Sequence, residues 1–138
     1  MRAQPQFPNE QTGTGEFKRQ SDAFRHWVTE DGRSGYPAAA GRYHLYVSLA
    51  CPWAHRTIIV RALKGLTEVI GMTVVDPIRA DQGWAFHNGP GHSLDTTKGF
   101  HFLSEAYRAT DPNYHGRVTV PVLWDTVTKR IVTNSDDD

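Results

Sequence analysis

Cysteine is nearly absent from this chain of 138 residues, which contains a single one, Cys51. One cysteine excludes a disulfide framework within the chain and is typical of a reducing compartment such as the cytoplasm. Net charge is absent too, because 15 Lys and Arg residues balance 15 Asp and Glu residues. Without a basic excess or a basic patch, neither nucleic acid nor an anionic membrane surface is expected as a main partner.

Long apolar runs are also missing. No stretch approaches the roughly 20 apolar residues that a membrane-spanning helix needs, and residues 1–8 lack the apolar segment of a signal peptide, so we expect neither. The glycine-rich phosphate-binding motifs are not found. His87 and His92 lie five residues apart with no cysteine or acidic cluster nearby, so we expect no metal centre.

The one cysteine stands at a predicted junction between a strand and a helix. Residues 42–48 are rich in aromatic and β-branched types, which favours a strand. Pro52 suits the first turn of a helix predicted over 53–64, and Gly65 suits its end. Backbone N–H groups and the helix dipole would then favour the thiolate, which is the nucleophilic form of cysteine.

Cys51 has a second interpretation, as a small buried hydrophobic residue, which is the usual situation of a free cysteine. The position at a helix start, with the positive charge of Arg56 nearby, favours the reactive interpretation instead. Ala54 stands where a dithiol oxidoreductase has its second cysteine. Redox chemistry at Cys51 would therefore need an external thiol, and glutathione is the obvious one.

The rest of the chain predicts further α and β elements. They are an apolar strand within 68–75, a long loop over 76–99, a helix over 100–109, and strands over 118–124 and 130–133. The first strand, helix and second strand should form a parallel pair with a right-handed crossover. Within the first helix, the apolar residues Ile58, Ile59, Ala62 and Leu63 predict one apolar stripe.

Residues 1–40 are expected to form a partly flexible N-terminal arm, and 41–138 a single domain. The first half of the arm is polar, which is typical of flexible segments. Phe24, Trp27 and Val28 follow at spacings of three and four residues. This spacing fits either one or two helical turns or a segment docked through its hydrophobic side chains.

The stretch Gly41–Arg56, which reads GRYHLYVSLACPWAHR, resembles the glutathionyl-hydroquinone reductases, the Xi class of glutathione transferases. Further stretches resemble the same family in the same order: Phe24–Val28, Lys64–Gly71, Val75–Pro77, Gly83–Phe86, Asp111–Tyr114 and Gly116–Asp125. Such an ordered set is far more specific than a Cys-Pro pair. The resemblance implies a thioredoxin-like α/β fold of order β-α-β-α-β-β, with the arm packed across it by aromatic anchors.

The resemblance also implies a glutathione site around Cys51 as the nucleophile. Trp84 would pack on glutathione, and Arg117 would pair with one of its carboxylates. A cis bond between Val120 and Pro121 would leave the Val120 backbone free to pair with glutathione. Taken alone, these residues have simpler interpretations: a core or lid aromatic, a solvated charge, and a trans proline at a strand edge.

The last residues depart from the family's pattern. Ser135 and Asp136 stand where the family has a glutamate and a serine, the latter holding the γ-glutamyl carboxylate of glutathione at a helix start. A carboxylate there would repel the ligand. The resemblance further implies that the last helix of the domain and the family's C-terminal helical domain are missing from this chain.

The activity implied by the resemblance is the removal of glutathione from glutathionyl-hydroquinones, through a mixed disulfide of Cys51 with glutathione. Glutathione is then the only co-substrate, no metal is needed, and the family member is a cytoplasmic homodimer. One alternative is an omega-like thiol transferase acting on dehydroascorbate or mixed disulfides, which only a comparison of substrates would separate. Another is a non-catalytic remnant that only binds, which the acidic residues after Asn134 favour.

Overall fold

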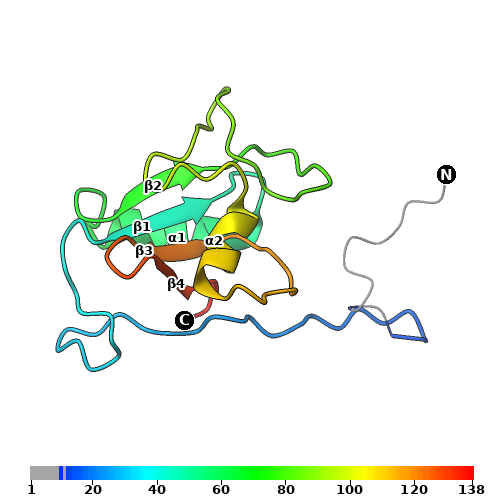
Figure 1. Cartoon of the computed structure of the whole chain (residues 1–138), viewed down its shortest axis with the longest axis horizontal. Helices are drawn as coiled ribbons and strands as arrows, with labels where there is room; N and C mark the ends of the chain where they lie inside the picture. The colour runs from blue at the N-terminus through cyan, green and yellow to red at the C-terminus, as the bar shows by residue number, and fades with distance from the viewer. Residues whose placement is uncertain (1–9, 11) are drawn as a thin grey trace.

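The computed structural model describes residues 10 and 12–138, and the prediction of flexibility for 1–9 and 11 lies outside them (Figure 1). Its elements are β1 (Tyr43–Val47), α1 (Pro52–Leu63), β2 (Gly71–Val74), α2 (Leu103–Thr110), β3 (Val122–Asp125) and β4 (Arg130–Thr133). This is the predicted order. Strand β3 begins later than predicted, directly after Pro121, because proline lacks the N–H that a strand ladder needs. Among the described residues, neither helix has the length and apolar character to cross a membrane.

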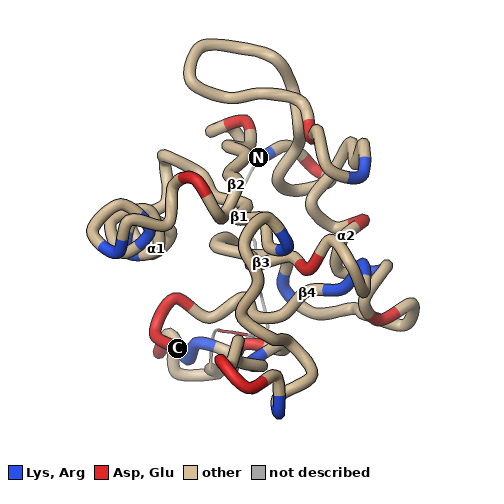
Figure 2. Tube along the Cα trace, turned by 90° about the vertical axis from the view of Figure 1, so that its left-hand side faces the viewer, with Lys and Arg blue, Asp and Glu red and all other residues tan. Residues whose placement is uncertain are grey.

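The four strands form one sheet in the order β2-β1-β3-β4. Strand β1 pairs with β2 in parallel and with β3 antiparallel, and β3 pairs with β4 antiparallel. Figure 2 shows the strands from the side, with α1 and α2 on opposite sides of the sheet and with basic and acidic residues interspersed. The predicted parallel crossover unit β1-α1-β2 is therefore present.

Helix α2 buries a regular stripe. Leu103, Ala106, Tyr107 and Thr110 are its buried residues, at spacings of three and four that place them on one face. Leu103, Ala106 and Tyr107 belong to one core cluster with buried side chains of the sheet, including Tyr46, Trp124 and Ile131. This side of the sheet holds most of the hydrophobic core.

Most of the predicted apolar stripe of helix α1 does not face the sheet. Ile59 is 51% exposed and Leu63 is 81% exposed, whereas Ala54 is fully buried. The face toward the sheet starts at Ala54 and continues through Ile58, one turn further on. The helix has apolar residues on two faces, and only the face holding the small Ala54 packs on the sheet. The other face remains an exposed apolar surface.

Residues 24–26 of the arm pair with β4 in an extended conformation. The His26 amide donates to the Val132 carbonyl at 3.0 Å, and the Asn134 amide donates to the Phe24 carbonyl at 3.1 Å. The Phe24 ring lies 5.7 Å from the Tyr107 ring. The docked alternative is therefore correct for this segment, and no helical turn forms there.

The prediction of an aromatic anchor is wrong for Trp27, which is 60% exposed. In an extended segment successive side chains point to opposite sides, so residues three apart do not share a face. Phe24 therefore packs against the domain, and Trp27 lies on the outside.

The loop predicted over 76–99 is ordered around one carboxylate. Asp95 accepts hydrogen bonds from the amides of Thr97 and Phe100, both at 3.0 Å, and from the Tyr46 hydroxyl at 2.9 Å. Burial raises the pKa of Asp95, but these bonds outweigh it and hold the pKa below its usual value. The loop so fixed buries Trp84 and Phe86. It can therefore place the Trp84 side chain without a helix or strand of its own.

A buried ion pair anchors the start of β1 to the end of β3. The Arg42 Nε and Nη2 atoms lie 2.9 and 2.8 Å from the two carboxylate oxygens of Asp125, which is fully buried. Burial opposes the charge of Asp125. Hydrogen bonds from Arg42 and Thr128 nevertheless lower its pKa from 3.8 to about 2.

We expect this pair to make stability depend on pH. Because the folded pKa of Asp125 is depressed, its contribution is present above pH 4 and is lost as the pH falls toward 2. The shift corresponds to about 2 kcal/mol of unfolding free energy. Asp125→Asn should lose about 2 kcal/mol of unfolding free energy at pH 7, because it removes the charge from a buried carboxylate that accepts hydrogen bonds from Arg42 and Thr128.

Urea unfolding at pH 7 and pH 3 measures both effects. The control is Asp31→Asn, since Asp31 is exposed and lies 3.9 Å from Arg33. An exposed pair of this kind contributes at most about 1 kcal/mol. Equal losses for the two variants would contradict the role given to Asp125.

Candidate active site

Cys51 is the residue immediately before α1. Its backbone is extended, with φ −105° and ψ 113°, and Pro52 occupies the first helical turn. No side chain caps the helix start, and the first turn contains no acidic residue. The positive end of the helix dipole therefore lies at Cys51, without a competing carboxylate in that turn. The side chain is half-buried, so a reagent can reach it.

The segment before β3 meets the thiol. The Val120–Pro121 bond is cis, as predicted. The Cys51 Sγ atom lies 3.8 Å from the Val120 carbonyl oxygen. Tyr107 of the core holds this segment, since its hydroxyl donates to the Thr119 carbonyl at 2.8 Å and accepts from the Thr119 amide at 3.1 Å. The backbone next to Cys51 is therefore positioned by the buried face of α2.

Cys51 opens into a cavity of about 300 Å³. Its lining comes from the arm, the start of α1, the long loop and the segment before β3: Phe17, Arg19, Ala50, Cys51, Pro52, Trp53, Arg79, Trp84, Arg117, Thr119 and Val120. Four residues singled out from the sequence, Cys51, Trp84, Arg117 and Val120, are thus brought together. We call this space the thiol cavity.

The thiol cavity is rich in guanidinium groups. Arg79 lies over the Trp84 ring, with 4.8 Å between its Cζ atom and the ring centroid. Burial lowers the pKa of Arg79, the neighbouring Arg117 lowers it further, and Cys51 acts in the opposite direction. Arg19 lies 5.6 Å from the Trp53 ring. Three arginines around one thiol make the cavity suited to an anionic ligand.

Sequence reasoning missed several lining residues. Arg79 lies in the long loop predicted over 76–99, and a loop of this length in a small domain is commonly functional, so its place was a usable signal. Phe17 and Arg19 belong to the arm, and the polar composition of that segment gave no indication that it reaches the cavity.

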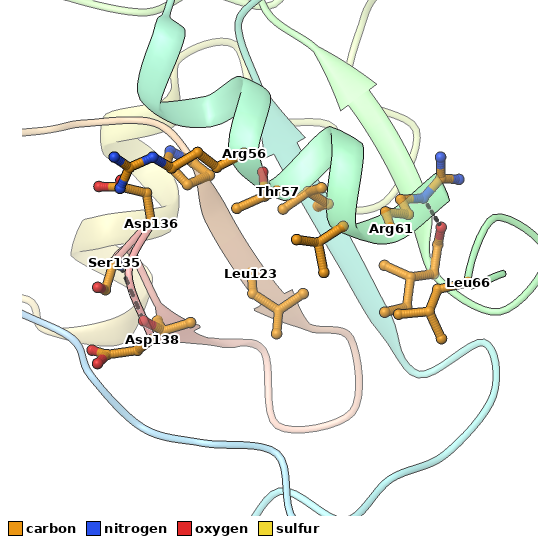
Figure 3. Close-up of a pocket in the computed structure, with 13 residues that line it drawn as sticks. Arg56, Thr57, Arg61, Leu66, Leu123, Ser135, Asp136 and Asp138 are labelled. Carbon is orange, nitrogen blue, oxygen red and sulfur yellow. Dashed lines mark hydrogen bonds and ion pairs between the residues drawn. The ribbon is translucent and has the colours of Figure 1, made fainter. Parts of the chain in front are cut away.

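The other three predicted residues lie outside the thiol cavity. Pro121, Ser135 and Asp136 line a neighbouring apolar groove between α1 and the sheet (Figure 3). The Asp136 carboxylate is 2.9 Å from the Arg56 Nη1 atom and 3.6 Å from Arg19. These pairs hold the chain end beside α1. They also balance the charge that was expected to repel a ligand.

The described part of the chain contains no group of three or more His, Cys, Asp and Glu side chains that could hold a metal ion. The ring nitrogen Nδ1 of His92 instead contacts the His87 carbonyl at 2.7 Å, and His87 pairs with Asp76 at 3.3 Å.

The sequence of this chain is similar to those of known glutathione transferases. Residues 50–137 match the family described as glutathione S-transferase, N-terminal domain. The chain is 50% identical over 127 residues to the glutathionyl-hydroquinone reductase YqjG of Escherichia coli, covering 87% of this chain and 39% of that protein. It is 46% identical over 120 residues to the glutathione S-transferase omega-like 2 of Schizosaccharomyces pombe, covering 87% of this chain and 38% of that protein.

Solved structures of glutathione transferases are also similar to this chain. The glutathione transferase Xi of Phanerochaete chrysosporium superposes with a TM-score of 0.83 at 45% identity, over 88% of this chain and 41% of that chain. The glutathione-bound structure of YqjG superposes with a TM-score of 0.80 at 50% identity, over 83% of this chain and 39% of that chain. The predicted thioredoxin-like fold is thereby confirmed. The chain spans about two fifths of the length of these relatives, and it belongs to the glutathione S-transferase family through its N-terminal domain.

Proposed function

We propose that this chain forms the glutathione-binding, thiol-bearing part of a glutathionyl-hydroquinone reductase. The observation that carries the proposal is the position of Cys51 at the start of α1, inside a cavity that three arginines line. A relative at 50% identity has this activity in its name, and its structure holds glutathione.

The residues of the thiol cavity match the chemistry of glutathione, a peptide with two carboxylates, one thiol and several backbone groups. Arg117 and Arg79 offer planar donors to a carboxylate. Trp84 offers a flat apolar surface. The Val120 backbone, next to the Cys51 sulfur, would pair with the peptide and bring the glutathione sulfur near Cys51.

The reaction then needs only Cys51 and glutathione. The Cys51 thiolate attacks the sulfur of the conjugate, so that a sulfur–sulfur bond forms and the bond between sulfur and the ring carbon breaks. The electron pair stays with the ring carbon, which takes up a proton, and the hydroquinone leaves. A second glutathione thiolate attacks the mixed disulfide, releases oxidised glutathione and restores Cys51. The ring carbon is reduced, and the glutathione sulfurs are oxidised.

The same cavity could serve an omega-like thiol transferase acting on dehydroascorbate or mixed disulfides. The name of the Schizosaccharomyces pombe relative favours that alternative. Both reactions pass through the same mixed disulfide. A homodimer in a reducing cytoplasm, as in the family, completes the proposal, and a single free cysteine suits such a compartment.

A comparison of substrates tests the proposal. With glutathione in excess, we expect the chain to release hydroquinone from a glutathionyl-hydroquinone with a kcat/KM at least about tenfold above that for dehydroascorbate. The reason is that only the conjugate brings its own glutathione to the cavity, which positions the reacting sulfur. A preference for dehydroascorbate would favour the omega-like activity. No reaction with either, together with measurable glutathione binding, would favour a domain that only binds.

A further inference from the structure

The carboxylate of Glu10, in the arm, pairs with Arg117, which is the arginine proposed to bind a carboxylate of glutathione. The Glu10 Oε1 atom lies 2.7 Å from the Arg117 Nη1 atom. Glu10 is 2% exposed, although it belongs to a segment that is otherwise mostly exposed. Burying a carboxylate costs free energy unless it is paired, so the contact with Arg117 stabilises Glu10 in its buried position.

Residues 12–20 of the arm fold back so that two of their amides reach Glu10. The Lys18 amide donates to the Glu10 carbonyl at 2.6 Å, and the Gln20 amide donates to the Glu10 carboxylate at 3.3 Å. Within the loop, the Thr12 amide donates to the Glu16 carbonyl at 2.9 Å. These bonds fix Glu10 to residues 18–20 and make the segment one unit. We call residues 10 and 12–20 the arm loop.

The arm loop reaches across the thiol cavity. Glu10 binds Arg117 on one side, and the Arg19 guanidinium lies 5.6 Å from the Trp53 ring on the other, beside Cys51. Arg19 also lies 3.6 Å from Asp136 at the end of the chain. Phe17 and Arg19 themselves line the cavity. The segment therefore contacts two residues that line the space beside Cys51, Arg117 and Trp53.

We propose that Glu10 is an internal carboxylate that occupies the anion subsite at Arg117, and that the arm loop is a strap which a carboxylate-bearing ligand must displace. For glutathione this inference rests on the proposed function. Glu10 takes up the Nη1 donor of Arg117, so a ligand carboxylate that uses this donor competes with Glu10. The apparent dissociation constant then equals the intrinsic one divided by the fraction of molecules in which Glu10 has left Arg117. Glu10 thus lowers the affinity of the cavity for ligands that bind Arg117 through a carboxylate.

Glu10→Gln tests the competition by titration calorimetry with glutathione. The variant keeps the shape of the side chain and removes its charge, so we expect glutathione to bind about tenfold more tightly than to the wild type. Glu16→Gln is the matched control, because Glu16 lies in the same loop and is exposed. Its affinity should equal that of the wild type. Glutathione diethyl ester, which lacks both carboxylates, should gain nothing from Glu10→Gln.

A second readout needs no glutathione. We expect trypsin to cleave after Lys18 several-fold faster in Glu10→Gln than in the wild type or in Glu16→Gln, because the strap opens. Equal cleavage rates, or a glutathione affinity that is unchanged or weaker in Glu10→Gln, would overturn the inference. If no variant binds glutathione, the proposed function fails, and the cleavage rates still decide whether Glu10 closes the strap. Should Glu10→Gln not fold, Glu10→Asp replaces it: its shorter side chain pairs less well with Arg117, so glutathione should bind more tightly than to the wild type, and an unchanged affinity would overturn the inference.

Discussion

Replacing Cys51 by serine is expected to lower the turnover of a glutathionyl-hydroquinone by at least about a thousandfold. A serine hydroxyl stays protonated at neutral pH and is a far weaker nucleophile than a thiolate. Because the chain has no other cysteine, no second thiol can replace it. Release of hydroquinone, followed by chromatography, measures the loss.

The fold should tolerate this substitution. Serine is a favourable residue at the position before a helix, and it is slightly smaller than cysteine. Cys51→Ser should therefore melt within a few degrees of the wild type and should still bind glutathione. A variant that folds and keeps more than about a tenth of the turnover would show that Cys51 is not the nucleophile.

A large loss of turnover is also expected for the polypeptide of 138 residues by itself. We expect its turnover to lie orders of magnitude below that of the Escherichia coli relative, of which it covers 39%. The family resemblance assigns the hydroquinone pocket to a helical domain outside this sequence, and positioning of a substrate can supply several kcal/mol of rate enhancement. The outer face of α1 agrees with this, since its residues Ile59 and Leu63 are 51% and 81% exposed.

Alkylation of Cys51 by iodoacetamide is the internal control. The reactivity of the Cys51 thiol depends on the start of α1, which the chain contains. The alkylation rates of this chain and of the Escherichia coli relative should therefore agree within about threefold. Supplying the remaining part of the relative as a separate chain should restore some turnover if the two pieces dock. Equal turnover without it would contradict this account of the hydroquinone pocket.

The parts of the fold that follow from short-range signals could be predicted from the sequence. Pro52 and Gly65 mark the two ends of α1 because each suits one end of a helix for a local reason. The positions of Cys51, Trp84, Arg117 and Val120 in one cavity followed from the family resemblance. The cis bond before Pro121 did too, since most bonds before proline are trans.

The remainder depends on contacts between distant segments. Helix α1 has apolar residues on two faces, and its periodicity alone could not show that the Ala54 face meets the sheet. Trp27 and Phe24 have a spacing that suits a helix, but pairing with β4 draws the segment into an extended conformation. The burial of Glu10 against Arg117 joins residues 107 positions apart, and the polar composition of the arm gave no sign of it.

One measurement tests the central claim most directly, namely that the thiolate of Cys51 takes glutathione from the conjugate. The protein is mixed with a slight excess of glutathionyl-hydroquinone without free glutathione, quenched with acid, and examined by intact-mass and peptide mass spectrometry. The account predicts glutathione on Cys51 as a disulfide that dithiothreitol removes, with one free hydroquinone released per adduct. An unmodified Cys51, or an adduct that contains the hydroquinone ring and resists dithiothreitol, would contradict it.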